Sequence, residues 1–215
     1  SKVIVVPHGN FDMYIPDTPP TIQEARLTLE LPQHATSALS IGHIREYKGI
    51  DALISAFEIA AKDNSDLYLV VAGSARTEAL KKRYADQIAN SAVSDRIRYR
   101  PEFIPNEAVA DYLTSADIIT LPYRAIDHSG IVHLAYSFGK PVLATRVGDF
   151  DEAIEHGKSG MIVDPDNVDV LAKELLDMSK SKSSLKEMGE SARMLNEPKY
   201  SWQDIARKTI AVYKS

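Results

Sequence analysis

Short apolar runs alternate along the chain with stretches that carry apolar residues at helical spacing, and this alternation limits the possible folds more than any other feature. The runs are rich in Val, Ile and Leu and lie at 3–6, 38–42, 67–73, 96–100, 117–122, 141–145 and 161–163. The helical spacing is clearest in 50–61, 109–116 and 170–178. Strands that alternate with helices form βαβ units around a parallel sheet, and unbroken apolar runs are typical of strands buried on both faces. We therefore predict an α/β fold with a doubly wound parallel sheet of about six strands, flanked by helices.

The order of the elements predicts one domain over residues 1–215. Residues 1–35 would hold a linker strand, a proline-rich loop and a short helix near 22–30, and residues 36–165 would form the α/β core. Residues 166–215 contain helical patterns only, and Ser201 begins an S-x-x-D sequence that is typical of a helix start. The apolar residues of that last helix, which we expect to form its buried side, are Ile205, Ile210, Val212 and Tyr213.

Composition excludes several classes of function. The formal net charge of −5 argues against nucleic acid as the main partner, because such proteins need a basic surface. The absence of cysteine excludes disulfides, zinc thiolates and a cysteine nucleophile. The sequence shows neither a long apolar run of membrane-spanning length nor the pattern of a signal peptide at its start. We expect a cytoplasmic location.

A glycine-flanked turn at 42–49 is the first candidate site, because it follows an apolar run and leads into a helix. The turn has the sequence GHIREYKG, so that Arg45 and Lys48 place two cations near the start of the helix. A helix N-terminus offers free N–H groups and the positive end of the helix dipole, which favour an anion. Either the turn binds an anion such as a phosphate, or it is a solvated basic turn in which Glu46 pairs with the cations.

The loop at 123–130, with the sequence YRAIDHSG, is the second candidate, and it also connects a strand to a helix. Ser129 is expected to cap that helix, and the N–H groups after it would face a phosphate. Asp127 and His128 would orient hydroxyl groups. The alternative is a capped helix with a polar loop and no ligand.

Metal and cofactor signals are weak. The six histidines are scattered, and His128 and His133 are five residues apart, which does not match the zinc-binding helix spacing. Two D-x-D triplets, at 149–151 and 164–166, offer carboxylates for a divalent cation, but aspartate is also favoured in turns. No phosphate-binding P-loop, G-x-G-x-x-G or G-x-S-x-G motif is present. We expect no metal and no cofactor.

Ordered blocks over nearly the whole chain resemble retaining GT-B glycosyltransferases of family four. The block GHIREYKGID at 42–51 resembles their donor-phosphate turn, and VVAGS at 70–74 resembles the next strand end. The block PEFIPNEAVADYLTSADIITLPYR at 101–124 is similar to their base-contacting loop, helix and fourth strand. The block SGIVHLAYSFGKPVLATRVGDFDEAI at 129–154 resembles the family's most recognisable stretch. The resemblance implies a Rossmann-like half of a GT-B fold that holds a nucleoside-diphosphate sugar.

The resemblance also implies roles for single residues. Arg45 and Lys48 would neutralise the diphosphate and stabilise the leaving group, while Gly42 and Gly73 would let the donor approach the strand ends. The backbone of Ser129 and Gly130 would hold the phosphates. The backbone of Phe103 and Ile104 would contact the base. Glu152 would contact hydroxyl groups of the sugar or cap the following helix.

One departure from the family pattern concerns two glutamates spaced E-x7-E. Ile126 and Leu134 stand at those positions in this chain. Asp127, one residue away, is the candidate replacement for the first glutamate, whereas nothing obvious replaces the second, which binds the ribose in relatives. The ribose contacts and the orientation of the sugar are therefore open.

The two ends resemble the linker strand and the final helix that connect the halves of a GT-B enzyme. We expect that the N-terminal acceptor domain is absent, so the chain would bind a donor weakly without transferring sugar. The full enzyme would use a glycan or lipid-linked acceptor for polysaccharide or glycoconjugate synthesis, and peripheral association with the inner face of the membrane is compatible with such an acceptor. The alternatives are a non-catalytic nucleotide-binding or interaction module, and a nucleotide-sugar epimerase of the same fold.

Overall fold

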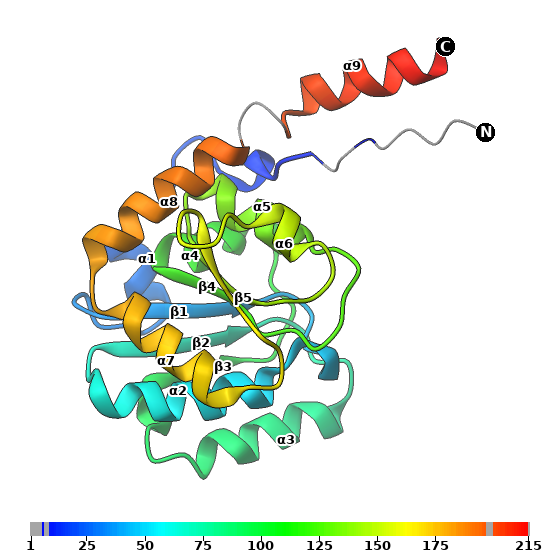
Figure 1. Cartoon of the computed structure of the whole chain (residues 1–215). Helices are drawn as coiled ribbons and strands as arrows, with labels where there is room; N and C mark the ends of the chain where they lie inside the picture. Colours follow the sequence, from blue (N-terminus) through cyan, green and yellow to red (C-terminus); the bar gives the residue numbers. More distant parts are fainter. Residues whose placement is uncertain (1–5, 7–8, 197–199, 215) are drawn as a thin grey trace.

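The computed structural model describes residues 6, 9–196 and 200–214 of the 215-residue chain. Six parallel strands form one sheet in the order β3-β2-β1-β4-β5-β6 (Figure 1). The strands are β1 Thr36–Ile41, β2 Leu67–Ala72, β3 Ile97–Arg100, β4 Ile118–Leu121, β5 Val142–Thr145 and β6 Gly160–Val163. The predicted doubly wound sheet of about six strands is therefore confirmed.

The strand order reverses between β1 and β4, because β1 has β2 on one side and β4 on the other. Chain connections then leave the sheet in opposite directions on the two sides of this point. In doubly wound sheets a ligand binds at the carboxyl ends of the strands where the order reverses. The topology therefore places a candidate site next to the ends of β1 and β4.

Helices cover both faces of the sheet and explain why its strands are apolar without alternation (Figure 1). One face packs against α2 Ile50–Asp63, α3 Glu78–Ala89 and α7 Val168–Ser179, and the other packs against α4 Asn106–Ser115 and α5 Gly130–Ser137. Helix α8 Lys182–Asn196 contributes Leu185 to the first core and Ala192 to the second, and α1 Ile22–Thr28 packs against α4. Successive residues of β2 show the principle, since Leu69 and Val71 belong to the first core and Val70 and Ala72 to the second. Strands inside the sheet thus need buried side chains on both sides, whereas the edge strand β3 carries Arg98 and Arg100.

Short polar side chains begin several of the helices, as N-caps do in general. Thr21 and Glu24 form a capping box at the start of α1, and Thr77 and Asn167 cap α3 and α7. Ser201 caps α9 Trp202–Tyr213, where its hydroxyl accepts a hydrogen bond from the Asp204 N–H at 3.3 Å. The predicted helix start at Ser201 is therefore confirmed.

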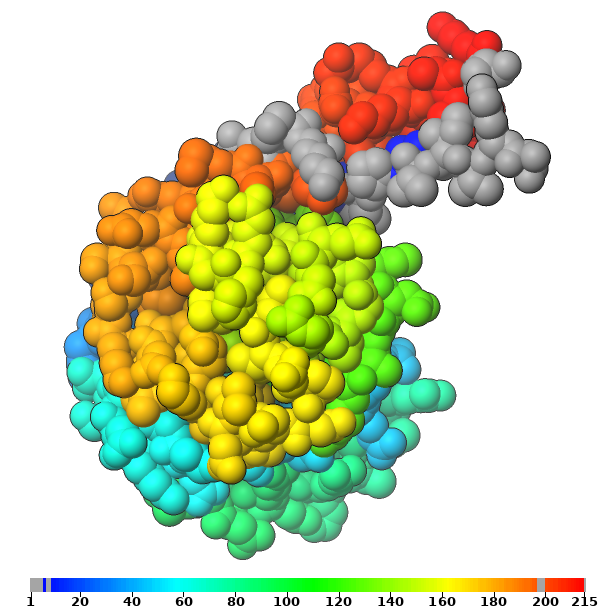
Figure 2. Space-filling view, viewed as in Figure 1, coloured from blue at the N-terminus to red at the C-terminus, as the bar shows by residue number. Residues whose placement is uncertain are grey.

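The prediction of a buried side for α9 is wrong for most of the helix. Ile205 is 7% exposed, but Ile210 and Tyr213 are 52% and 87% exposed. The helix is attached at its beginning, where the Trp202 indole N–H donates to the Asn10 carbonyl oxygen at 3.0 Å. Beyond that point α9 projects away from the sheet, and within the described residues no layer covers its far half (Figures 1 and 2).

The remaining short elements are the 3-10 turns η1 Asp12–Tyr14, η2 Glu46–Lys48 and η3 Ser94–Arg96 and the helix α6 Phe150–Ala153. Of the predicted linker strand at 3–6, only Val6 lies within the described residues, and it is not in a strand. None of the helices in the described ranges combines the length and the apolar character needed to cross a membrane.

Candidate functional site

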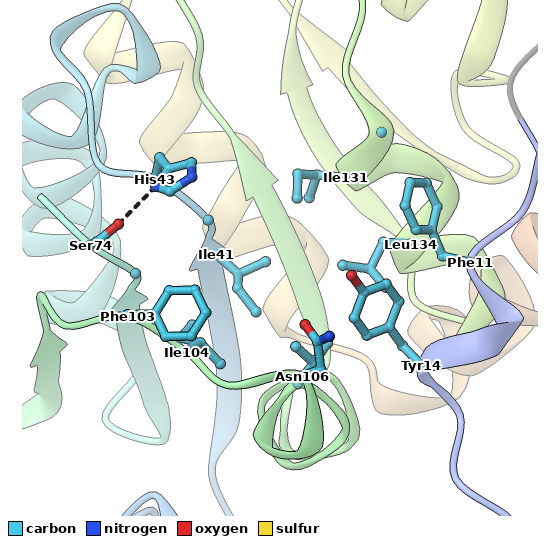
Figure 3. A pocket seen from close by; sticks show the side chains of 14 residues that line it. Phe11, Tyr14, Ile41, His43, Ser74, Phe103, Ile104, Asn106, Ile131 and Leu134 are labelled. Carbon is cyan, nitrogen blue, oxygen red and sulfur yellow. Dashed lines mark hydrogen bonds between the residues drawn. The ribbon is translucent and has the colours of Figure 1, made fainter. Parts of the chain in front are cut away.

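A cavity of about 320 Å³ opens at the carboxyl ends of β1 and β2, beside the point where the strand order reverses. Five of the predicted site residues contribute to its wall: Gly42, Gly73, Phe103, Ile104 and Gly130. The other lining residues are Phe11, Tyr14, Ile41, His43, Ser74, Asn106, Val109, Ile131 and Leu134 (Figure 3). The wall is mainly apolar with a few polar groups, which is usual for small-molecule sites.

Two glycines keep the strand ends of this cavity open. Gly42 and Gly73 have φ angles of +104° and +128°, a region that residues with a side chain rarely adopt. A Cβ atom on Gly73 would collide with the carbonyl oxygen of Gly42, so the two strand ends approach each other more closely than any other residue would permit. The backbone at the cavity floor is therefore directly accessible to a ligand.

Lys48 is the last residue of the 3-10 turn η2, and its ammonium group lies near Gly42 at the end of β1. The residue is only 8% exposed, and Nζ lies 5.2 Å from the ring centroid of Tyr123. A Cβ atom on Gly42 would be 3.2 Å from this Nζ, which places the charge at the edge of the cavity. Burial, with a smaller contribution from the charge of Arg45, lowers the pKa of Lys48 to about 8.

The side chains of Arg45 and Lys48 form no ion pair with an acidic group anywhere in the described part of the chain. Glu46, the residue expected to pair with them if the turn were merely solvated, lies 3.9 Å from Arg83 instead. Asp51, the next acidic residue, pairs with Arg124 at 2.9 Å. The described acidic side chains therefore do not pair with these two cations, and the alternative of a turn paired through Glu46 does not hold.

The start of α5 faces the cavity from the other side. The Ser129 hydroxyl accepts a hydrogen bond from the Ile131 N–H at 3.4 Å, as the predicted N-cap requires. Gly130 follows and lines the cavity, and a Cβ atom there would be 2.9 Å from the ring of Phe11. Backbone N–H groups at a helix N-terminus favour an anion, so α5 and the two cations favour the same kind of group.

Several wall residues were not predicted, and two of them, Phe11 and Tyr14, come from a segment distant in sequence. Phe11 and Tyr14 belong to the loop around η1 and pack against α5 and the core beneath it. His43 Nδ1 and Ser74 Oγ, 2.7 Å apart, form a hydrogen-bonded pair across the ends of β1 and β2 (Figure 3). The local sequence gives no signal for Phe11 and Tyr14, which stand in a short loop beside the further apolar residues Met13 and Ile15.

Five predicted site residues are not among those that line the cavity: Arg45, Lys48, Asp127, Ser129 and Glu152. Asp127 and Glu152 are the two that no observation brings near it. Asp127 is exposed and lines a separate, open hollow with Tyr47 and Gly148. Glu152 is exposed in the first turn of α6 and is not among the lining residues of the cavity. Their roles toward a sugar therefore stay predictions. Leu134, at the second position of the missing glutamate pair, does line the cavity and brings only an apolar side chain there.

The two D-x-D triplets lie beside arginines. Arg146 pairs with Asp151, and its Nε lies 3.4 Å from Asp164. Asp166 lies 3.5 Å from Arg124. Within the described residues, no three His, Asp or Glu side chains come together in a way that would hold a metal ion. The independence of the chain from metal ions stays a prediction.

A sequence model of the family described as Glycosyl transferases group 1 matches residues 22–195. The chain belongs to this family. The match extends from α1 to the end of α8 and so includes the whole sheet and most of the cavity.

Relatives of this group 1 glycosyltransferase chain include a D-inositol 3-phosphate glycosyltransferase of Corynebacterium urealyticum. The two are 26% identical over 217 residues, which cover 99% of this chain and 50% of the relative. The chain thus spans about half the length of these curated relatives.

Solved structures of similar fold include Anabaena HepE in complex with UDP and glucose, with a TM-score of 0.84 and 19% identity over 96% of this chain and 55% of that one. The C-terminal domain of a group 1 glycosyl transferase, LpcC from Francisella tularensis, has a TM-score of 0.79 and 19% identity, and the match covers 91% of this chain and all of that domain. At such identities the likeness shows the fold alone, and it confirms the predicted Rossmann-like half of a GT-B fold.

Proposed function

We propose that this chain is the donor-binding half of a retaining glycosyltransferase, which transfers a hexosyl group from a nucleoside-diphosphate sugar to a glycan or lipid-linked acceptor. The observation that carries the proposal is the position of Lys48, whose ammonium group lies at the edge of an apolar cavity, with the charge of Arg45 close enough to act on it. Neither cation has an acidic partner in the described residues. The N-terminus of α5 faces the same cavity. A diphosphate with an attached nucleoside matches both the charge and the apolar wall.

The proposed chemistry depends on charge that develops on the leaving group. When the bond between the sugar and the diphosphate breaks, negative charge grows on the phosphate oxygen. Arg45 and Lys48, fixed in a partly dehydrated site, would stabilise that charge more than water does. Ser129 and Gly130 would add backbone N–H groups at the start of α5.

The nucleoside would occupy the apolar part of the cavity. Backbone at Phe103 and Ile104 would contact the base, and the open glycine backbone at Gly42 and Gly73 would allow close approach. Asp127 and Glu152 are the acidic residues that we assign to the sugar side, outside the cavity.

The acceptor would be bound by a second domain, since the chain spans about half the length of its relatives. We expect that this chain alone binds a donor nucleotide and does not transfer sugar, and that no metal ion or cofactor takes part. A cytoplasmic location near a lipid-linked acceptor and a role in polysaccharide synthesis belong to the same proposal.

A second candidate function is a nucleotide-binding module without catalysis. It is favoured by one observation: among the described residues that line the cavity, none is an aspartate or a glutamate. Both functions predict nucleotide binding, so they differ only in turnover once the acceptor half is supplied.

The direct test is calorimetric titration of the chain with UDP, GDP and ADP. We expect one of them to bind with a Kd of about 10 µM to 1 mM, which is about −7 to −4 kcal/mol. Failure of all three to bind would contradict both functions. A second experiment separates the two functions. The acceptor-binding half is added together with a panel of acceptors and a sugar nucleotide that carries the same base as the diphosphate that binds. Only a transferase would then release the diphosphate.

The affinity for the diphosphate should depend on pH through Lys48. Its pKa of about 8 means that the ammonium group is mostly charged below pH 8 and loses its proton above it. A bound diphosphate stabilises the charged form, so affinity should be constant near pH 7 and fall by about tenfold between pH 7.5 and 9.5. A Lys48→Arg variant keeps its charge in this range and should give a flat profile by calorimetry. An equal fall in both proteins would contradict the assignment.

A further inference from the structure

Two polar side chains reach into the cavity without a partner from the described part of the chain. The Tyr14 hydroxyl and the Asn106 amide form no hydrogen bond with another described side chain or backbone group. Both residues line the cavity and lie near each other at one end of it, Tyr14 from η1 and Asn106 from the first turn of α4 (Figure 3). They also line a neighbouring hollow, so they form part of the rim between the two.

Their position follows from the rest of the site. The Lys48 ammonium group, with the charge of Arg45 acting on it, and the glycine backbone mark one edge of the cavity as the place for the diphosphate. Tyr14 and Asn106 lie away from that edge, next to Leu134 (Figure 3). A nucleoside whose phosphates lie at Gly42 therefore extends toward Tyr14 and Asn106.

The chemistry of this end of the cavity is a mixture of apolar surface and two neutral polar groups. Leu134, Val109 and Ile104 offer carbon atoms only, and the cavity has no carboxylate among its described lining residues. A phenol and an amide each donate and accept hydrogen bonds. The phenol and the amide are therefore suited to bind neutral hydroxyl groups of a ligand. The Leu134 side chain alone would leave such hydroxyl groups without a hydrogen-bond partner.

We propose that Tyr14 and Asn106 bind the 2′- and 3′-hydroxyl groups of the nucleotide ribose. The inference rests on the proposed function, because it takes the ligand to be a nucleoside diphosphate. The hydroxyl of Tyr14 and the amide of Asn106 are the hydrogen-bonding groups, and Leu134 packs against the carbon face of the sugar. The pair thus gives the site its preference for a ribonucleotide over a nucleotide without these hydroxyls.

The experiment compares, by calorimetry, the nucleoside diphosphate that binds the unmodified chain with its 2′,3′-dideoxy counterpart. We expect the unmodified chain to prefer the ribonucleotide by about tenfold. Tyr14→Phe combined with Asn106→Ala should bring this ratio close to one and leave the affinity for the dideoxy compound unchanged. Tyr213→Phe, which removes the same hydroxyl from an exposed position on α9, is the matched control and should keep the ratio.

The outcomes separate the two proposals. If the unmodified chain binds the ribonucleotide and the double variant keeps the full preference, the assignment of Tyr14 and Asn106 is overturned while the proposed function stands. If the unmodified chain shows no preference, the assignment is overturned in the same way. If no nucleoside diphosphate binds the unmodified chain, the proposed function itself fails. An equal loss for both ligands in the double variant would indicate damage to the cavity and would also overturn the assignment.

Discussion

Replacing Arg45 with alanine and Lys48 with methionine is expected to weaken binding of a nucleoside diphosphate by about a hundredfold or more. Hydrogen bonds to charged groups contribute about 1.5–3 kcal/mol each, and two of them therefore exceed the roughly 2.8 kcal/mol that a hundredfold change requires. Methionine is chosen because it keeps an unbranched apolar stem between Gly42 and the Tyr123 ring. Titration calorimetry measures the change.

The folded state should survive this substitution. Lys48 is 8% exposed and has no acidic partner in the described ranges, so removing its charge relieves a desolvation cost rather than breaking an ion pair. Lys62→Met, at an exposed site near the end of α2, serves as the control and should bind normally. Unchanged affinity in the double variant, with a normal thermal transition, would show that the ligand does not lie at this turn.

The second large effect concerns stability. Asp117→Ala is expected to lower the free energy of unfolding by about 3–5 kcal/mol, the range for breaking a buried ion pair from one side. The Asp117 carboxylate accepts from Arg26 Nη2 at 2.8 Å and from the Ser37 N–H at 2.7 Å, and Arg26 is 3% exposed. Its negative charge also favours the charged form of the buried Lys140, so its loss affects two cations. Urea denaturation followed by circular dichroism measures the change.

The control is Asp177→Ala, which breaks exposed pairs with Lys173 and Lys180 and should change stability little. The double variant Arg26→Met with Asp117→Leu removes both charges of the pair and should recover part of the loss, because the charge of Arg26 is then no longer buried without a partner. If Asp117→Ala and Asp177→Ala had the same free energy of unfolding, this would contradict the stabilising role of the Asp117 carboxylate between α1 and the start of β4.

The sheet could be predicted from the sequence because burial on both faces leaves unbroken apolar runs. The core of each strand falls within its predicted run, as in β2, which is Leu67–Ala72 against a predicted 67–73. Helix α3 was not singled out, since most of its residues are polar and charged. Its buried residues Leu80, Tyr84 and Ile88 are four apart, and that spacing was the available signal.

The candidate site was predictable only where it is local in sequence. The turn with Gly42, Arg45 and Lys48 is continuous, so its glycine and its charges are visible together in the sequence. The wall formed by Phe11 and Tyr14 depends on packing against α5, more than a hundred residues later, and no local pattern shows it. The same limit explains α9, whose apolar residues predicted a buried side that the described part of the chain does not provide.

The most direct test of the central claim is to follow the amide signals of the chain by NMR during titration with UDP, GDP and ADP. We predict that at least one of the three causes saturable chemical-shift changes in amide signals, concentrated at Gly42, Gly73, Ile104 and Gly130. The exposed end of α9 should show no such changes. Shifts confined to other surfaces, or no shifts with any of the three at millimolar concentration, would contradict the claim that this cavity binds a nucleoside diphosphate.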